Sequence, residues 1–323
     1  GLAGEDCEMK RTICLGILAV VGVTLSAASN EALQVRAGLA LHEVSDNLYM
    51  LANAPSVQGM GGGGNTAIFL TDEGVVLVDT KISGYGTAIL GHIREITDLP
   101  ISTIINTHTH WDHSGSNIEF PDTVNFIVHE NTLAHMSRPT CDDGAGYRGG
   151  SITNCEAFKG ANSKYLPKTS FATRTSLFSG PQQIDLYYFG RGHTDGDTFV
   201  VFKEARTMHT GDMFARRGLP FLDVDNTNGS AIEFGATLQK AVEGIPGVDI
   251  IIPGHDLTTR TWEDFVKYSG FYNDVLTKAR AGMAAGQTVS DVVASYTVPT
   301  QYSEFQATAD RLRTTVQHIF DGQ

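Results

Sequence analysis

The stretch NTHTHWDHSG at residues 106–115 places three histidines and one aspartate within six positions. It adjoins the apolar run ISTIINT, which predicts a buried β-strand ending at the cluster. His108 and His110 are two positions apart, so in extended chain their side chains point the same way. A turn beyond the strand end can swing Asp112 and His113 toward the same point. Neutral imidazoles with a carboxylate suit zinc, and this density disfavours the alternative of a polar turn whose histidines only cap backbone.

Three later polar residues also lie at the ends of predicted strands. His193, in GHTDGD, follows the run QIDLYYF; Asp212, in HTGDMF, follows RTMHT; and His255, in IIPGHD, follows VDIII. The chain therefore predicts one metal-binding constellation assembled from several strand ends. The histidines outside this constellation are predicted to be surface or capping residues: His42, His92, His129, His135, His209 and His318.

The remaining pattern consists of two batches of strands, each followed by helices. Apolar runs predict a hairpin over 39–51 and strands at 65–70, 75–80, 101–107, 125–128, 183–189, 197–202, 206–210 and 248–254. Helical periodicity predicts helices over 85–97, 129–136, 230–242, 262–284, 289–294 and 304–320. Two sheets packed together with helices outside satisfy both patterns. Residues 137–170 show no clear periodicity and are predicted to form a functional loop.

The beginning of the chain predicts export. Residues 9–28 combine a basic start, a short apolar run and small terminal residues, which is typical of a signal peptide; an N-terminal membrane anchor is the alternative. Residues 1–8 are interpreted as an extension, and 29–323 as one domain. The predicted location is periplasmic or secreted, with no stable membrane span after cleavage. The net charge of −13 repels phosphate backbones, so a small-molecule substrate is predicted rather than nucleic acid; the oligomeric state is left open.

Two of the four cysteines, Cys141 and Cys155, lie in the predicted domain. They are 14 positions apart, and the residues between them are mostly small or polar, so core packing cannot hold that segment in a fixed shape. Because export supplies an oxidising compartment, a disulfide is predicted. Two free thiols, one of them a zinc ligand, are the alternative, which the already complete set of histidine and aspartate ligands disfavours.

The motif His-x-His-x-Asp-His and the order of the later sites resemble the metallo-β-lactamase superfamily of hydrolases. The motif is highly specific for that family, and the resemblance runs from about residue 39 to the end of the chain. It implies an α/β fold, the αββα four-layer sandwich, with two mixed β-sheets flanked by helices. It also implies that metals lie on one rim between the two sheets.

The resemblance further implies two zinc ions per chain. The residues at the ligand positions are His108, His110 and His193 for the first zinc, Asp112, His113 and His255 for the second, and Asp212 as a bridge between both. Asp79 corresponds to the aspartate that steadies the histidine loop, although DTK here replaces the more usual Asp-Thr-Gly. Trp111, between the ligands, is expected to pack beside the metals or to shape the floor of the substrate site.

The implied function is that of an exported zinc-dependent hydrolase, which attacks the carbonyl of a lactone, ester or thioester with a metal-bound hydroxide. Asp112 is the expected catalytic residue, because it can bind the second zinc and also pass a proton. An aspartate at 212 is the pattern of glyoxalase-II-like thioesterases and lactone hydrolases, whereas true β-lactamases of the family have Cys or Ser there. The alternatives are a β-lactamase acting on antibiotics, a mononuclear-iron oxygenase of thiols, and a non-enzymatic metal-binding protein.

The glycine-rich run GMGGGGN, residues 59–65, resembles a run in exported members of the superfamily. It lacks the Gly-Lys-Ser/Thr ending of a phosphate-binding loop and does not open a helix. We therefore expect a flexible loop that acts as a mobile lid over the zinc rim.

Overall fold

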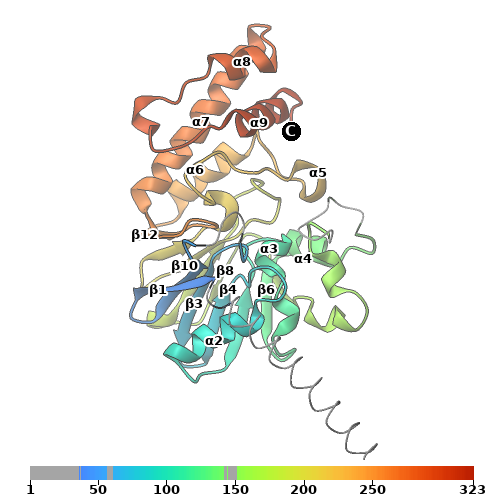
Figure 1. The fold of residues 1–323 in the computed structure, drawn as a ribbon, viewed down its shortest axis with the longest axis vertical. Coiled ribbons are helices and arrows are strands. Elements are labelled where there is room, and N and C mark those ends of the chain that lie inside the picture. The colour runs from blue at the N-terminus through green and yellow to red at the C-terminus, as the bar shows by residue number, and fades with distance from the viewer. Residues whose placement is uncertain (1–35, 37, 57–60, 142–143, 145–150) are drawn as a thin grey trace, which may run out of the picture.

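Two β-sheets lie face to face at the centre of the molecule in the computed structural model, which describes residues 36, 38–56, 61–141, 144 and 151–323 (Figure 1). The predicted extension (1–8) and signal peptide (9–28) lie outside these residues. Among the described helices, none has the length and apolar character needed to cross a membrane. Helices cover the outer face of each sheet, so the predicted αββα sandwich is confirmed.

The first sheet has seven strands in chain order. Its strands are β1 (Leu39–Ser45), β2 (Leu48–Asn53), β3 (Thr66–Thr71), β4 (Gly74–Val78), β5 (Ile101–Ile105), β6 (Asn125–His129) and β7 (Thr169–Phe171). The pairs from β1 to β4 are antiparallel, and those from β4 to β7 are parallel. The chain crosses over between parallel strands through α2 (Gly86–Ile96) and the segment that carries the histidine motif. This crossover brings the motif to the rim of the sheet.

The second sheet has six strands in the order β13-β12-β11-β10-β9-β8. These strands are β8 (Arg174–Leu177), β9 (Ile184–Tyr187), β10 (Phe199–Phe202), β11 (Thr207–His209), β12 (Ile250–Ile252) and β13 (Arg260–Thr261). Only the β11–β12 pair is parallel. The short strands β7 and β8 were not predicted, because their residues are largely polar and half of them are exposed.

Alternation along the central strands builds the core on both faces of each sheet. In β4, Val76 and Val78 pack into the cluster between the sheets, whereas Val75 and Leu77 pack toward α2. Burial on both faces explains why this strand is an uninterrupted apolar run and not an alternating one. The outer face of the second sheet packs on α6 (Phe234–Gly244) and α7 (Trp262–Ala284), in a cluster rich in aromatic residues.

Helices α7, α8 (Val289–Ser295) and α9 (Ala309–Phe320) form the end of the molecule farthest from α2 (Figure 1). The prediction of α7 is confirmed residue for residue, and a capping box of Thr261 and Asp264 explains its sharp start. The predicted start of the last helix at 304 is wrong. Phe305 is buried there in a non-helical segment, which pairs with residue 218 and so cannot join the helix.

The segment 137–170 contains more regular structure than its composition indicates. It includes two 3₁₀ helices, Cys155–Phe158 and Gly160–Tyr165, and Phe158 is almost fully buried. The structure contains the predicted disulfide between Cys141 and Cys155, whose Cα atoms are 5.7 Å apart. The disulfide joins the two ends of the segment 141–155, which is described only in part. This segment borders the histidine motif, since Ile152 O accepts a hydrogen bond from Trp111 N.

We predict that replacing both Cys141 and Cys155 with alanine lowers the free energy of unfolding by about 3 kcal/mol, because the open chain gains conformational entropy when unfolded. Urea unfolding of the zinc-loaded proteins measures the difference. Zinc content serves as the control, since neither sulfur is placed among the metal ligands. Equal unfolding midpoints, or two alkylated cysteines in the unreduced protein, would contradict the prediction.

Candidate metal centre

The seven predicted ligands all lie at one rim of the sandwich, where strands from both sheets end. His108 and His110 follow β5, and Asp112 and His113 lie on the short helix α3 (Trp111–Ser114) directly after them. The other three come from the loops that follow β9, β11 and β12, and are His193, Asp212 and His255. Parallel pairing of β4 with β5 and of β11 with β12 aligns these strand ends, so residues about 150 positions apart in sequence meet at one point.

Three overlapping groups of side chains have ligand atoms within 4.8 Å of one another. They are His108, His110 and His193; Asp112, His113 and His255; and His108, His113 and Asp212. The first two groups match the two sets expected from the sequence. The third shares members with both, which places Asp212 at the centre of the constellation.

Distances around Asp212 show how it joins the two sets. Its Oδ1 lies 3.3 Å from Nε2 of His113 and 3.3 Å from Nε2 of His255. Its Oδ2 lies 3.7 Å from Nε2 of His193, on the other side. Each carboxylate oxygen therefore faces a different set of histidines, which is the arrangement required of a bridging ligand.

Several buried nitrogen and oxygen atoms at this centre carry lone pairs but take part in no hydrogen bond. Within the described part of the chain, His108 Nε2, His193 Nε2 and Asp212 Oδ1 are buried without a hydrogen bond. Nε2 of His113 and Nε2 of His255 face each other at 3.2 Å. Buried polar atoms are normally satisfied, so such a set fits metal ions held by imidazole and carboxylate ligands.

The charges of these groups suit metal binding. Burial, and then the neighbouring histidines, hold the pKa of His108 well below its ordinary value, which keeps its ring neutral. Burial opposes ionisation of Asp212, but His255 and His113 outweigh it and hold the pKa of that carboxyl well below its ordinary value. Burial also opposes a charged His113, yet Asp79, Asp112 and Asp212 together hold its pKa well above the ordinary value. Protons must leave the histidines when metal binds, so metal affinity falls with falling pH.

Asp79 orients two of the histidines from behind. The carboxylate is fully buried, and its Oδ2 accepts a hydrogen bond from His113 Nδ1 at 2.7 Å. It also accepts from the amide of Thr107 at 2.8 Å and from its hydroxyl at 2.7 Å. Because the Thr107 hydroxyl donates to Asp79, it accepts from His108 Nδ1 at 3.0 Å. These bonds direct Nε2 of both histidines into the centre.

Two further carboxylates at the centre were not recognised from the sequence. Asp223 accepts a hydrogen bond from His110 Nε2 at 2.9 Å; burial opposes its ionisation, but this bond outweighs it and lowers the pKa of Asp223 to about 2. Asp197 Oδ1 lies 3.4 Å from His193 Nδ1, and its Oδ2 accepts from the amide of Thr194. Asp197 lies within the conspicuous stretch GHTDGD, but nothing in the surrounding sequence distinguishes Asp223, which is 113 positions from its partner.

Lys81 occupies the position of the glycine in the more usual Asp-Thr-Gly, and its surroundings accommodate the longer side chain. Its φ of 62° lies in the left-handed region that glycine adopts easily. Its side chain is fully buried, and Nζ donates to the carbonyl of Gly64 at 2.8 Å. Burial lowers the pKa of Lys81 to about 7, against the opposing charge of Asp79.

The glycine run lies beneath the centre and is not a lid over it. Residues 62–65 are buried, and the expectation of a mobile lid is wrong for them; Gly59 and Met60 lie outside the described residues. The amide of Gly64 donates to Asp112 O at 2.9 Å, and a Cβ added to Gly64 would collide with the His113 ring. Glycine is required here because the backbone passes so close to the imidazole.

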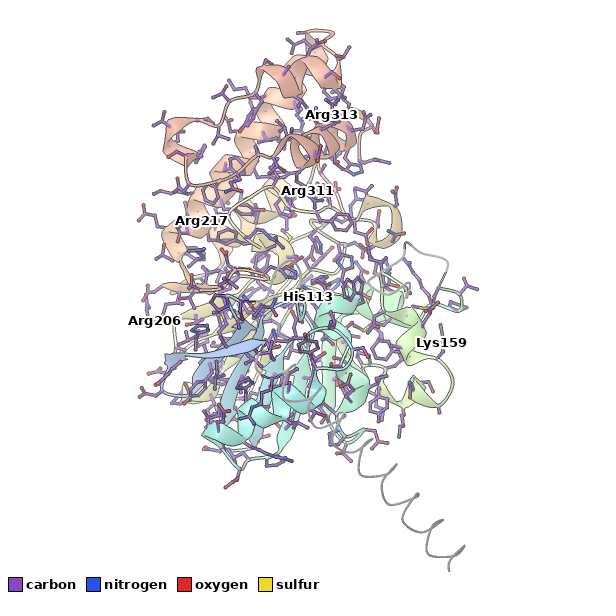
Figure 2. All side chains as sticks on the ribbon, in the orientation of Figure 1. His113, Lys159, Arg206, Arg217, Arg311 and Arg313 are labelled. Atoms are coloured by element: carbon purple, nitrogen blue, oxygen red, sulfur yellow. A yellow bond between two sulfur atoms is a disulfide. The ribbon has the colours of Figure 1, made fainter. Side chains whose placement is uncertain are left out.

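A cleft of about 570 Å³ opens above the centre, a volume suited to a small molecule. Asp112, Asp212 and His255 line its floor together with Trp111, as expected for that tryptophan. The opposite wall comes from residues 215–221 and from the segment around the start of α9. In Figure 2, His113 lies near the middle of the molecule, and Arg311, in the first turn of α9, lies on the side of His113 toward the C-terminal end of the molecule.

Comparisons with known proteins agree with this fold. A sequence model of the metallo-beta-lactamase superfamily matches residues 59–266. The alpha subunit of 2,4-dinitroanisole O-demethylase from Nocardioides sp. (strain JS1661) is 27% identical over 147 residues, which are 44% of this chain but only 38% of that protein. A metallo-beta-lactamase from Pontibacter korlensis has 19% identity and a TM-score of 0.56, covering 73% of this chain and 99% of its own. The DIM-1 metallo-beta-lactamase has 16% identity and a TM-score of 0.54, covering 73% and 97%.

We predict that Gly64→Ala lowers zinc affinity at the second group of ligands about tenfold or more, because the new methyl group displaces the His113 ring. Competition with a chromogenic chelator measures the affinity. Gly91→Ala is the matched control, since a Cβ at that helical position meets only the flexible side chain of Arg36. Unchanged zinc affinity in Gly64→Ala would show that the ring is not held by this contact.

Asp223→Asn should weaken zinc binding at the group containing His110 by about tenfold, because a neutral amide is a poorer acceptor for the imidazole N–H. Asp225→Asn, an exposed neighbour, is the control and should bind zinc as the parent protein does. The same chelator competition applies, and equal affinities for both variants would remove Asp223 from the site.

Lys81→Met should change how stability depends on pH. The folded pKa of about 7 lies below the ordinary 10.5, so between these values the unfolded chain binds a proton that the folded chain does not. The stability of the parent protein relative to Lys81→Met therefore rises with pH above about 7, by at most about 1.4 kcal/mol per pH unit, and is flat below it. Urea unfolding at pH 6 to 9 measures this difference. The exposed Lys168→Met variant is the control, and its stability should follow that of the parent protein over this pH range. If the stability of Lys81→Met also changed with pH in parallel with that of the parent protein, the prediction would be refuted.

Proposed function

The chain belongs to the metallo-beta-lactamase superfamily, and from that premise we propose that it is a hydrolase that uses two zinc ions to cleave a lactone, ester or thioester. The observation that carries the proposal is the position of Asp212, whose two oxygens face different groups of histidines. A carboxylate at this position can bind two cations, one through each oxygen, whereas a neutral side chain there would bind only one metal ion.

The donor set fits two ions in the groups described above. His108, His110 and His193 would hold the first ion, and Asp112, His113 and His255 the second, with Asp212 between them. Ions bound there supply Lewis acidity and a nucleophilic water at neutral pH. We propose zinc because imidazole and carboxylate are the ligands that zinc accepts in four-coordinate sites with an open position.

The chain's own residues then orient the substrate and move the proton. Asp112 lines the cleft, and its Oδ2 faces His255 Nε2 at 3.4 Å and His113 Nε2 at 3.9 Å. Among the described residues, no hydrogen bond engages its other oxygen, so we propose that Oδ1 accepts the proton released during attack and returns it to the leaving group. Trp111 and Phe221, both lining the cleft, would exclude water from the bound carbonyl.

Two other activities are included in the test because relatives carry them in their names. Two solved structures similar to this chain are named metallo-beta-lactamases, and one partial relative is named as a subunit of a 2,4-dinitroanisole O-demethylase. Hydrolysis of 2,4-dinitroanisole would require hydroxide to attack the nitro-activated aryl carbon and expel methoxide, leaving the phenolate, whereas ester hydrolysis requires attack on a carbonyl carbon and expels the alcohol, so the two substrates test different reactions. An iron-dependent thiol oxygenase differs from all of these in its metal.

We expect the protein to contain two zinc ions per chain and to hydrolyse lactones, thioesters or 4-nitrophenyl esters faster than a chromogenic cephalosporin or 2,4-dinitroanisole. Metal analysis and initial rates on this panel provide the measurements. Asp212→Ala should lower both zinc content and turnover, by about a hundredfold or more in turnover. The exposed Asp98→Ala is the control. One iron per chain, or an Asp212→Ala protein with two zinc ions and full activity, would overturn the proposal.

A further inference from the structure

The end of the chain beyond the family match contributes directly to the cleft. The match ends at residue 266, within α7, and the helical segment that follows returns to the metal centre at its far end. Three residues of this segment line the cleft: Gln306, Thr308 and Arg311. The wall opposite the metal ligands is thus built partly by a segment that the shared family pattern does not include.

The start of α9 is held firmly in place at the cleft. Gln306 donates its amide to Arg217 O and accepts from the amide of Leu219, both at 3.1 Å. Phe305, next to it, is buried and stacks on Phe271 with ring centroids 5.2 Å apart. Leu312 anchors the first turn of α9 in the same apolar cluster. This fixed backbone determines where the Arg311 side chain can reach.

Arg311 extends toward the metal centre along one aromatic ring. Its guanidinium carbon lies 5.5 Å from the centroid of the Phe221 ring. That ring in turn lies 6.2 Å from the His110 ring and 6.1 Å from the His193 ring. Phe221 is 41% exposed, so an apolar group in the cleft can contact it. A single side chain therefore separates the guanidinium from the ligands of the first group.

Two of the three arginines in this cleft have no carboxylate partner among the described residues. Arg217 pairs with Asp264 at 2.7 Å, but neither Arg216 nor Arg311 forms an ion pair or a side-chain hydrogen bond within that part of the chain. Burial is the main cause that lowers the pKa of Arg311, and the charge of Arg216 acts in the same direction. Arg216 is exposed and Arg311 is partly buried, and both line the same cleft, so an anion bound between them can pair with both guanidinium groups.

We propose that Arg216 and Arg311 form an anion subsite, and that the substrates are organic acids with an apolar body. The carboxylate binds the two guanidinium groups, the apolar body lies on Phe221, and the bond to be hydrolysed reaches the metal centre. The cleavage of that bond rests on the proposed function, whereas the anion subsite rests on the arginines alone. Both arginines are specificity residues, since they contact the part of the substrate remote from the reacting bond.

Equilibrium binding tests the subsite without requiring turnover. Naphthalene-2-sulfonate, a weak metal ligand, is titrated with the zinc-loaded protein and followed by its fluorescence; its neutral N,N-dimethyl sulfonamide is the matched probe. We expect the sulfonate to bind more tightly than the sulfonamide. Arg311→Gln and Arg216→Gln should each weaken sulfonate binding about tenfold and leave the sulfonamide unchanged, while Arg311→Lys keeps the charge but loses the planar guanidinium and should weaken binding less than Arg311→Gln does.

Arg313→Gln is the matched control, because Arg313 lies two positions along the same helix and donates to Ser290 in α8, away from the cleft. Its sulfonate affinity should equal that of the parent protein. Equal sulfonate affinity in the parent and in the Arg216→Gln/Arg311→Gln double variant, with both folded by circular dichroism, would overturn the subsite. That result would place the anion on the metals instead.

Kinetics then connect the subsite to the reaction. The 4-nitrophenyl ester of trans-4-carboxycyclohexanecarboxylic acid is compared with 4-nitrophenyl cyclohexanecarboxylate, which lacks the charge. Arg311→Gln should raise KM about tenfold for the acid only, with kcat changed little, because the subsite binds a part of the substrate that does not react. Selective sulfonate binding without hydrolysis of any ester would support the subsite and overturn the proposed function. Equal loss for both esters would overturn the role of Arg311 in specificity.

Discussion

The hydrogen bonds to the buried carboxylate of Asp79 are the interaction on which the metal centre depends. Asp79 follows β4, and through Thr107 and His113 it ties that strand end to the end of β5 and to α3. A buried charge is tolerated only when it is paired and hydrogen-bonded, so Asp79 must keep all three donors in place. The hydrogen bonds that Asp79 accepts therefore also determine which ring nitrogens of the histidines face the centre. The ligand geometry is thus fixed by the same contacts that hold the folded chain together.

Similar outer contacts surround the rest of the centre, and they come from elements that are distant in sequence. His110 is held by Asp223, His193 lies beside Asp197, and Gly64 and Lys81 support His113 from below. The left-handed backbone at Asp79 and Lys81 has a local conformational cost, which this hydrogen-bond network offsets. Four of the seven ligands, His108, His110, His113 and His193, therefore each contact a residue outside the ligand set, which orients their rings.

Two parts of the chain form the cleft. The sandwich shared with the superfamily supplies the candidate metal ligands, while Gln306, Thr308 and Arg311 after α7 supply part of the opposite wall. Aromatic packing of Phe305 and Phe271 joins this wall to the second sheet's helical layer, so its position depends on the core and not on loop flexibility. Chemistry that is common to the family can thus be combined with recognition that belongs to this chain.

The sequence by itself determined the fold class, the seven residues that meet at the rim, the disulfide and the helix α7. Strand and helix periodicity and motif spacing are local signals that can be recognised in the linear chain, and the resemblance to the superfamily supplied the four-layer arrangement and the grouping of the ligands. Only the tertiary structure decided that the glycine run supports the centre from below, that Asp223 faces His110, that the last helix starts at Ala309, and that Arg311 reaches the cleft. Each of these features depends on contacts between segments that are far apart in the chain. Such contacts form only when the packed sheets and helices bring those segments together, so local sequence signals do not reveal them.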